Sequence, residues 1–122
     1  MMPRGCVLVV DDDDAIVEST VALLRASGIQ AEGTTDPASV LPLMRALRPI
    51  AVLHDYAMPG LEWAKHIEAI RADPLVGATR IMLFSAAFTT DEIAVRFRLD
   101  GVLSKPCRPT ELLLAVAPRH GS

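Results

Sequence analysis

Residues 7–15 read V-L-V-V-D-D-D-D-A, so an apolar run passes directly into four consecutive aspartates. The apolar run begins at Cys6 and is aliphatic and largely β-branched, which is typical of a strand buried on both faces of a parallel sheet. A run of acids is most often a solvated surface patch. The rest of the chain decides whether these carboxylates form such a patch or a site at the end of a buried strand.

Further apolar runs alternate along the chain with stretches of helical pattern, without repeats or linkers. The expected strands are Cys6–Val10, Gln30–Thr34, Ile50–His54, Arg80–Phe84 and Val102–Ser104. The expected helices are approximately Ala15–Ser27, Asp36–Leu47, Leu61–Ala72, Thr89–Leu99 and a last helix that Pro109 opens and Pro118 ends. This alternation predicts an α/β fold, a doubly wound five-stranded parallel sheet flanked by five helices.

Two of the helix starts carry recognisable signals. Asp13 or Asp14 is placed to cap the first helix, where an acid also complements the helix dipole. Asp36-Pro37 combines an N-cap acid with proline at the first helical position. Pro42, inside the second helix, removes one helical hydrogen bond, which predicts a bend or a loose turn there.

Length and composition favour a single domain over residues 1–122, with a frayed tail at 119–122. The net charge of −3 provides no broad basic surface, so this domain is not expected to bind nucleic acid. The cysteines have neither C-x-x-C nor Cys/His spacing, which argues against disulfides and zinc and fits a cytoplasmic protein. No apolar run approaches the ~20 residues that span a bilayer, so no membrane association is expected.

Polar residues with chemical potential follow four of the five expected strands. They are Asp11 and Asp12, Asp55, Ser85 and Lys105. Because the carboxyl ends of parallel strands share the edge where open α/β sheets bind ligands, we expect these side chains to converge. Carboxylates brought together repel one another unless a cation neutralises them, and oxygen ligands favour a hard ion such as Mg²⁺. A metal, a lysine and a hydroxyl around a carboxylate nucleophile are the parts that phosphoryl transfer requires.

With these segments the sequence resembles the receiver domain of two-component response regulators, a CheY-like family. The matching segments are V-L-V-V-D-D-D, A-V-L-H-D-Y-A-M-P-G, I-M-L-F-S-A and D-G-V-L-S-K-P, and they cover essentially the whole chain. The resemblance implies a flavodoxin-like sheet of order 2-1-3-4-5. It also implies a signal transduction protein, not an enzyme, that undergoes Mg²⁺-dependent self-phosphorylation from a donor and slow autodephosphorylation. The implied donor is a histidine kinase or a histidine phosphotransfer protein.

The resemblance also implies a role for each site residue. Asp55 matches the phosphoacceptor, and Asp11 and Asp12 match the acidic pair that holds Mg²⁺. In the family the residue at Asp12 is usually the direct ligand, and the one at Asp11 acts partly through water. The backbone carbonyl of Ala57 matches a further metal ligand, which completes a metal set of Asp11, Asp12, Asp55 and Ala57.

Ser85 matches the switch hydroxyl of the family and Lys105 its phosphate-binding lysine, and the bond between Lys105 and Pro106 is expected to be cis. One departure concerns Val102, where the family usually has Tyr or Phe. A stiff valine cannot swing between buried and exposed positions as an aromatic ring does. The segment between Ser85 and Lys105 is also slightly shorter than is common. The output, to a downstream protein or through a homodimer, is therefore left open.

Three other features have simpler interpretations. Trp63 replaces a common glycine of the family, and a half-buried packing role is expected for it. His54 precedes Asp55, so strand alternation places it on the opposite side as a satisfied or half-exposed histidine. Val17 and Val21 lie on the first helix, and either of them, if exposed, is a candidate docking contact for the phosphodonor kinase.

Two other functions are alternatives for this sequence. Residues 12–16 approximate the D-x-D-x-hydrophobic motif of haloacid-dehalogenase-like phosphatases, but after residue 100 the chain offers only Glu111 for their late acidic pair. The second is a receiver-like scaffold for protein interaction whose output does not depend on phosphate. An EF-hand is excluded, because a loop starting at Asp11 has Ile16 where Gly is required and Ala22 where Glu is required.

Overall fold

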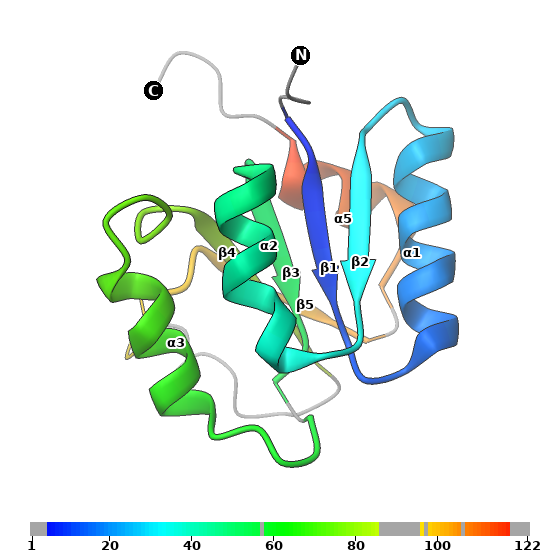
Figure 1. Cartoon of the computed structure of the whole chain (residues 1–122). Coiled ribbons are helices and arrows are strands. Elements are labelled where there is room, and N and C mark those ends of the chain that lie inside the picture. The colour runs from blue at the N-terminus through cyan, green and yellow to red at the C-terminus, as the bar shows by residue number, and fades with distance from the viewer. Residues whose placement is uncertain (1–4, 57, 86–95, 97, 106, 118–122) are drawn as a thin grey trace.

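The computed structural model describes residues 5–56, 58–85, 96, 98–105 and 107–117. Its centre is a five-stranded parallel sheet of order β2-β1-β3-β4-β5 (Figure 1). The strands are β1 Val7–Val10, β2 Ala31–Thr34, β3 Ala51–His54, β4 Arg80–Ser85 and β5 Gly101–Ser104. The doubly wound sheet and its strand order are therefore as predicted, with strand bounds close to those expected.

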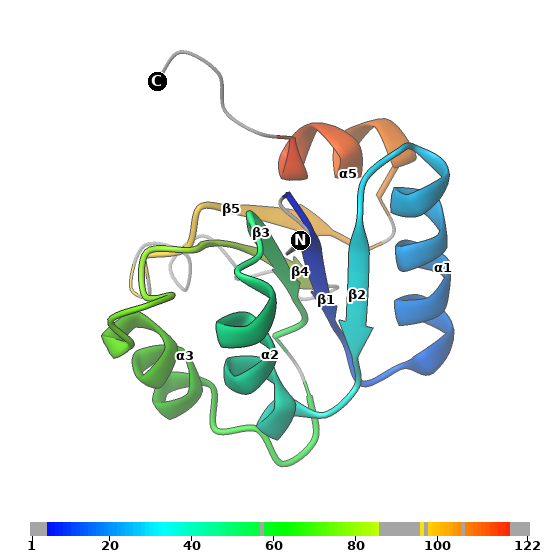
Figure 2. The same cartoon turned by 45° about the horizontal axis from the view of Figure 1, so that its top comes forward.

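Helices cover both faces of this sheet, α1 and α5 on one face and α2 and α3 on the other (Figures 1 and 2). The α-helices within the described residues are α1 Asp14–Ala26, α2 Val40–Leu47, α3 Trp63–Ala72 and α5 Pro109–Val116. Most of the expected helix Thr89–Leu99 lies outside the described residues. No helix in the described ranges is both long and apolar enough to cross a membrane.

The start of α1 resolves the choice between two capping aspartates. The side chain of Asp13 accepts hydrogen bonds from the backbone N–H groups of Ala15 at 2.9 Å and Ile16 at 3.4 Å. Asp13 is therefore the N-cap, and Asp14 is the first helical residue. The helix stops just before Gly28, whose φ of 84° is a left-handed conformation that glycine adopts without strain.

The expected single helix from Asp36 consists of two parts. A 3₁₀ turn, η1 Pro37–Ser39, precedes α2, and the side chain of Asp36 caps this turn by accepting from the N–H of Ala38 at 3.0 Å. Pro42 lies in the first turn of α2, where backbone N–H groups have no intrahelical acceptor, so the proline removes no helical hydrogen bond. The predicted loss of a helical hydrogen bond at Pro42 is therefore wrong, and the irregularity of the expected helix lies before this residue, as the tighter 3₁₀ turn η1.

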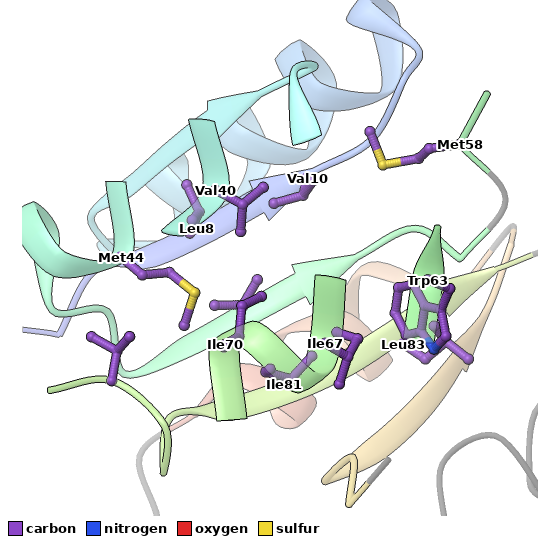
Figure 3. Packing of buried hydrophobic residues seen from close by; sticks show 12 residues of the cluster. Leu8, Val10, Val40, Met44, Met58, Trp63, Ile67, Ile70, Ile81 and Leu83 are labelled. Atoms are coloured by element: carbon purple, nitrogen blue, oxygen red, sulfur yellow. The ribbon is translucent and has the colours of Figure 1, made fainter. Parts of the chain in front are cut away.

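Side chains that alternate along the strands fill two separate apolar cores. The core toward α2 and α3, shown in Figure 3, includes Leu8, Val10, Val40, Met44, Val52, Ile67, Ile70, Ile81 and Leu83. The core toward α1 and α5 includes Val7, Val9, Leu24, Ala51, Leu53, Leu103, Leu112 and Val116. Because β1 and β3 supply both cores, every residue of these strands is buried, which explains why all of them except His54 are apolar.

Candidate functional site

The carboxyl ends of β1 and β3 place two aspartates next to each other. The two strands pair in parallel with Val10 opposite His54, so the next residue of each chain segment, Asp11 and Asp55, leaves the sheet at the same edge. The backbone N–H of Asp55 donates to the carbonyl of Val10 at 2.8 Å. Both aspartates are buried, at 0% and 5% exposure. The end of a buried strand thus fixes the backbone of each one.

The ends of β4 and β5 bring two further residues to this edge. Ser85 is the last residue of β4, is 2% exposed, and pairs with Ser104 of β5. The N–H of Lys105 donates to the carbonyl of Ser85 at 3.1 Å, which continues the pairing of the two strands by one residue. The convergence expected from the alternating strands is therefore found at the level of the backbone.

Three carboxylates gather at this edge. Asp11, Asp12 and Asp55 each offer an oxygen, and these oxygens all lie within 4.8 Å of one another. Asp12 is exposed, whereas the other two are buried. One carboxylate oxygen of Asp11 also accepts from the backbone N–H of Asp13 at 3.0 Å, so the residue that caps α1 helps to orient Asp11. The run of aspartates therefore combines a buried acidic site with a helix cap.

Lys105 provides positive charge at this site. Its ammonium forms an ion pair with Asp11, and its Nζ lies 3.4 Å from Oδ1 of Asp55. The lysine side chain is 16% exposed, and its ammonium lies 5.1 Å from the centroid of the Phe84 ring, whose face attracts cations. One ammonium and three carboxylates leave an excess of negative charge.

The pKa of Asp55 reflects its burial first and the charges around it second. Burial raises the pKa of Asp55, Lys105 partly lowers it, and the charge of Asp11 raises it again, so the pKa lies above its ordinary value. A nearby cation favours the ionised form of a carboxyl group. The donor set consists of oxygen atoms alone, which fits a hard divalent cation such as Mg²⁺ and does not fit a soft metal.

Two expectations for this edge concern residues outside the described ranges. They are the metal-binding carbonyl of Ala57 and the cis bond between Lys105 and Pro106.

A histidine pair lies directly behind Asp55. His54 is completely buried on the face opposite the Asp55 side chain, as strand alternation predicts. Its Nδ1 lies 2.7 Å from the backbone carbonyl oxygen of Asp55, and its Nε2 lies 2.8 Å from Nε2 of His66 on α3. Burial lowers the pKa of His54 to about 3, so the ring is neutral near pH 7. His54 is therefore the satisfied histidine of the sequence prediction.

Sequence reasoning missed His66. A signal was available, because Trp63, His66, Ile67 and Ile70 recur with the spacing of the buried face of a helix. A histidine inside such an apolar stripe requires a polar partner in the core, since an unpaired polar group is costly to bury.

Two residues outside the acidic site, Trp63 and Val17, are more buried than expected. Trp63 is 8% exposed, not half-buried, and packs edge-on against His54 and Tyr56 with ring centroids 5.2 and 5.1 Å apart. It lies in the core between α3 and the sheet (Figure 3). Val17 is 9% exposed and packs on Gly33, so it is not the exposed docking contact considered above, and Val21 is partly buried.

Comparisons with known proteins agree with this geometry. The family model of the response regulator receiver domain matches residues 7–117. The DNA-binding response regulator MtrA of Mycolicibacterium smegmatis is 32% identical over 117 residues, which cover 95% of this chain and 50% of that protein. The probable transcriptional regulatory protein NarL of Mycobacterium tuberculosis is 35% identical, over 90% of this chain and 52% of that protein. The chain thus spans about half the length of these relatives.

Solved structures share the fold. The chemotaxis response regulator CheY4 of Vibrio cholerae superposes with a TM-score of 0.82 at 22% identity, over 93% of this chain and 97% of that chain. The N-terminal domain of a response regulator receiver protein from Methanoculleus marisnigri superposes with a TM-score of 0.75 at 26% identity, over 93% of this chain and 98% of that chain.

Proposed function

The chain belongs to the response regulator receiver family, and we propose that its Asp55 carboxylate accepts a phosphoryl group from a histidine kinase or a histidine phosphotransfer protein. The observation that carries this proposal is the gathering of Asp11, Asp12 and Asp55 within 4.8 Å, with Lys105 paired to two of them. The proposal treats the chain as one receiver domain, because all described strands belong to one sheet.

The acidic residues are proposed to hold Mg²⁺. Asp11, Asp12 and Asp55 supply carboxylate oxygens for this purpose, and the backbone carbonyl of Ala57 is the further proposed ligand. When bound, Mg²⁺ supplies positive charge that offsets the repulsion among the carboxylates and the charge of an incoming phosphoryl group.

Asp55, Lys105 and Ser85 are proposed to have different roles in phosphoryl transfer. An oxygen of the Asp55 carboxylate forms a bond to phosphorus while the bond from phosphorus to the donor imidazole nitrogen breaks, and the imidazole leaves with that electron pair. Lys105, with its Nζ at 3.4 Å from Asp55, is placed to pair with an oxygen of the transferred group. The hydroxyl of Ser85, at the end of the neighbouring strand, is proposed to donate to another oxygen.

The phosphatase hypothesis requires a nucleophile at Asp12 and a second acid at Asp14. Asp14 is instead the exposed first residue of α1 and does not belong to the acidic trio. Asp55, which the phosphatase motif does not use, is buried, whereas Asp12 is exposed. The geometry therefore favours the acceptor role of Asp55 over this alternative.

The output is proposed to be a protein contact with a downstream partner or a second copy of the chain, in the cytoplasm and without nucleic acid or membrane. Val102 is partly buried against the core on the α2 and α3 face. Because valine has no aromatic ring that could turn inward, a conformational change on phosphorylation of this protein has to use another side chain. The phosphate-independent scaffold stays the alternative for this reason.

Intact-mass measurement tests the proposal. The protein is incubated with Mg²⁺ and acetyl phosphate, and the expected result is the gain of one phosphoryl group, which is lost in Asp55→Asn. Asp14→Asn is the matched control, because it makes the same chemical change at an exposed aspartate outside the trio. An adduct that persists in Asp55→Asn contradicts the proposal, and steady phosphate release through Asp12 supports the phosphatase. If neither an adduct nor an effect of Mg²⁺ is found, the scaffold is favoured.

A further inference from the structure

The histidine pair behind the acidic site has a defined arrangement of protons. A carbonyl oxygen only accepts hydrogen bonds, so Nδ1 of His54, at 2.7 Å from the Asp55 carbonyl, carries a proton. A neutral imidazole has one such proton, which leaves Nε2 of His54 as an acceptor. Nε2 of His66, at 2.8 Å, is then the donor. The tautomers of both rings are therefore fixed by the contacts around them.

The pair lies where β3 and α3 pack against each other. His54 ends a fully buried strand, and His66 lies one helical turn after Trp63 on the same face of α3. The ring of His54 packs edge-on against both, with centroids 5.2 Å from Trp63 and 4.9 Å from His66. Tyr56 adds a further edge contact to Trp63 at 5.1 Å. The four rings therefore contact one another in a series from Tyr56 through Trp63 and His54 to His66.

The hydrogen bonds of this region hold both backbone groups of Asp55. Its N–H donates to Val10 on β1, and its carbonyl accepts from His54. With the backbone held on both sides, only the side-chain torsions of Asp55 remain free to direct its carboxylate. Small displacements of a reacting group lower transfer rates strongly, so the restraint bears on reactivity.

We infer that His66 is a positioning residue for the phosphoacceptor: from α3 its Nε2–H donates to Nε2 of His54 and holds that ring in place, so that the Nδ1–H of His54 keeps the carbonyl of Asp55 fixed and the carboxylate oriented for transfer. A merely structural role predicts no such link between α3 and reactivity. Apolar side chains fill this face of the sheet elsewhere, and they do so without the desolvation of two imidazole rings. The inference rests on the proposed function of Asp55 as the acceptor.

Three variants separate positioning from packing. His66→Leu keeps much of the volume and removes the donor. His66→Gln places an amide N–H₂ near the position of Nε2 and keeps the donor. Lys65→Leu is the matched control, since it makes the same apolar change on the same helix at a side chain that is 82% exposed. The tautomers of His54 and His66 are read in each protein from long-range ¹H–¹⁵N correlation spectra.

The kinetic measurement is the rate of phosphorylation by acetyl phosphate with Mg²⁺, followed by intact mass over a range of donor concentrations. His66→Leu is expected to lower the saturating rate by about 10- to 100-fold while changing the half-saturating concentration much less. His66→Gln is expected to restore most of the rate, and Lys65→Leu to react as the unaltered protein does. In the unaltered protein, His54 is expected as the Nδ1–H tautomer and His66 as the Nε2–H tautomer.

Several results overturn the inference. One is an Nε2–H tautomer at His54 in the unaltered protein, a result that does not depend on any variant folding. Others are an undiminished saturating rate in His66→Leu, or a folded His66→Gln that transfers as slowly as His66→Leu. If the unaltered protein gains no phosphoryl group, or gains one without Asp55, the proposed function and this inference fall together. A normal Asp55 adduct with a normal rate in His66→Leu overturns the inference alone.

Discussion

Lys105 forms an ion pair with Asp11, a residue that lies 94 positions earlier in the chain. The side chains are 16% and 1% exposed, so the pair is nearly removed from water. The same ammonium lies 3.4 Å from Asp55. A single positive charge from the carboxyl end of β5 therefore stabilises the aspartates that follow β1 and β3.

Replacing this lysine is expected to destabilise the protein. Lys105→Met leaves Asp11 and Asp55 as neighbouring buried acids without their cation, and breaking such a pair lowers the free energy of unfolding by about 3 kcal/mol. The loss is expected to be smaller with Mg²⁺ than with a chelator, because a bound cation replaces the missing charge. Urea unfolding followed by the fluorescence of Trp63, the single tryptophan, measures both values. Equal losses in the two conditions contradict the expectation.

The aspartates of the opening run are expected to differ sharply in their effects. Mg²⁺ at about 100 times its dissociation constant stabilises a protein that binds it only when folded by about 2.7 kcal/mol. Asp12→Ala is expected to abolish this gain, whereas Asp14→Ala keeps it and lowers stability by about 0.3–1 kcal/mol through the helix dipole. Titration of Mg²⁺ by calorimetry and urea unfolding provide the two readouts. A full Mg²⁺ effect in Asp12→Ala counts against the metal site.

Asp73 connects the end of α3 to α2 and is expected to contribute a pH dependence. Its carboxylate accepts from Nε of Arg45 at 2.8 Å and from the N–H groups of Leu75 at 2.8 Å and Val76 at 3.2 Å. The hydrogen bond from Arg45 is the largest cause that lowers the pKa of Asp73 below its ordinary value. The ionised form is thus favoured in the folded protein.

Because the folded pKa is depressed, the stabilisation from Asp73 is fully present above the ordinary aspartate pKa of about 3.9 and is lost as the pH falls through the folded pKa. The stability difference between the unaltered protein and Asp73→Asn is therefore expected to shrink as the pH falls below about 4. Urea midpoints measured at several pH values between neutral and acid test this, with Asp36→Asn as a control at an exposed cap. A difference that stays constant with pH refutes the assignment.

Gly33 of β2 allows α1 to pack closely on the sheet. A Cβ added at this position would lie 2.3 Å from Cγ1 of Val17 and 3.2 Å from Cγ2 of Val21. Because valine side chains have little freedom, Gly33→Ala is expected to lower the free energy of unfolding by about 1–3 kcal/mol. Val17→Ala removes the closest methyl group. The double variant is therefore expected to lose less free energy of unfolding than the sum of the losses in the two single variants. Additive losses in urea unfolding exclude this contact as the cause.

The centre of the sheet could be predicted from the sequence because β1, β3 and most of β4 are buried on both faces and have largely apolar sequences, whereas the edge strand β2 has exposed residues. The convergence of the residues at the strand ends, from Asp11 to Lys105, could then be predicted from the parallel arrangement alone, because the carboxyl ends of all parallel strands lie at one edge of the sheet. Local signals also located the starts of α1 and α5 to within one residue. They left the choice between Asp13 and Asp14 open, because both residues can supply a capping oxygen and only the backbone conformation distinguishes them.

The partner of His54 could not be predicted with the same ease, because it depends on the rotation of α3 about its axis. That rotation follows from how Trp63 and its neighbours fill the space over β3 and β4. Strand alternation is enough to predict the face on which His54 lies. To predict its hydrogen bond to His66, one must also know how α3 packs against the sheet. Val17 shows the same limit, since its burial follows from the missing side chain of Gly33 on β2.

The run of aspartates is a connection of fixed length. Asp11 holds a position in the acidic site, Asp13 caps α1, and a hydrogen bond of 3.0 Å joins the two. An inserted or deleted residue here shifts either the acid away from Lys105 or the cap away from the helix. Surface loops ordinarily tolerate changes in length. The short turn after the first strand of this chain is therefore expected to tolerate such changes poorly.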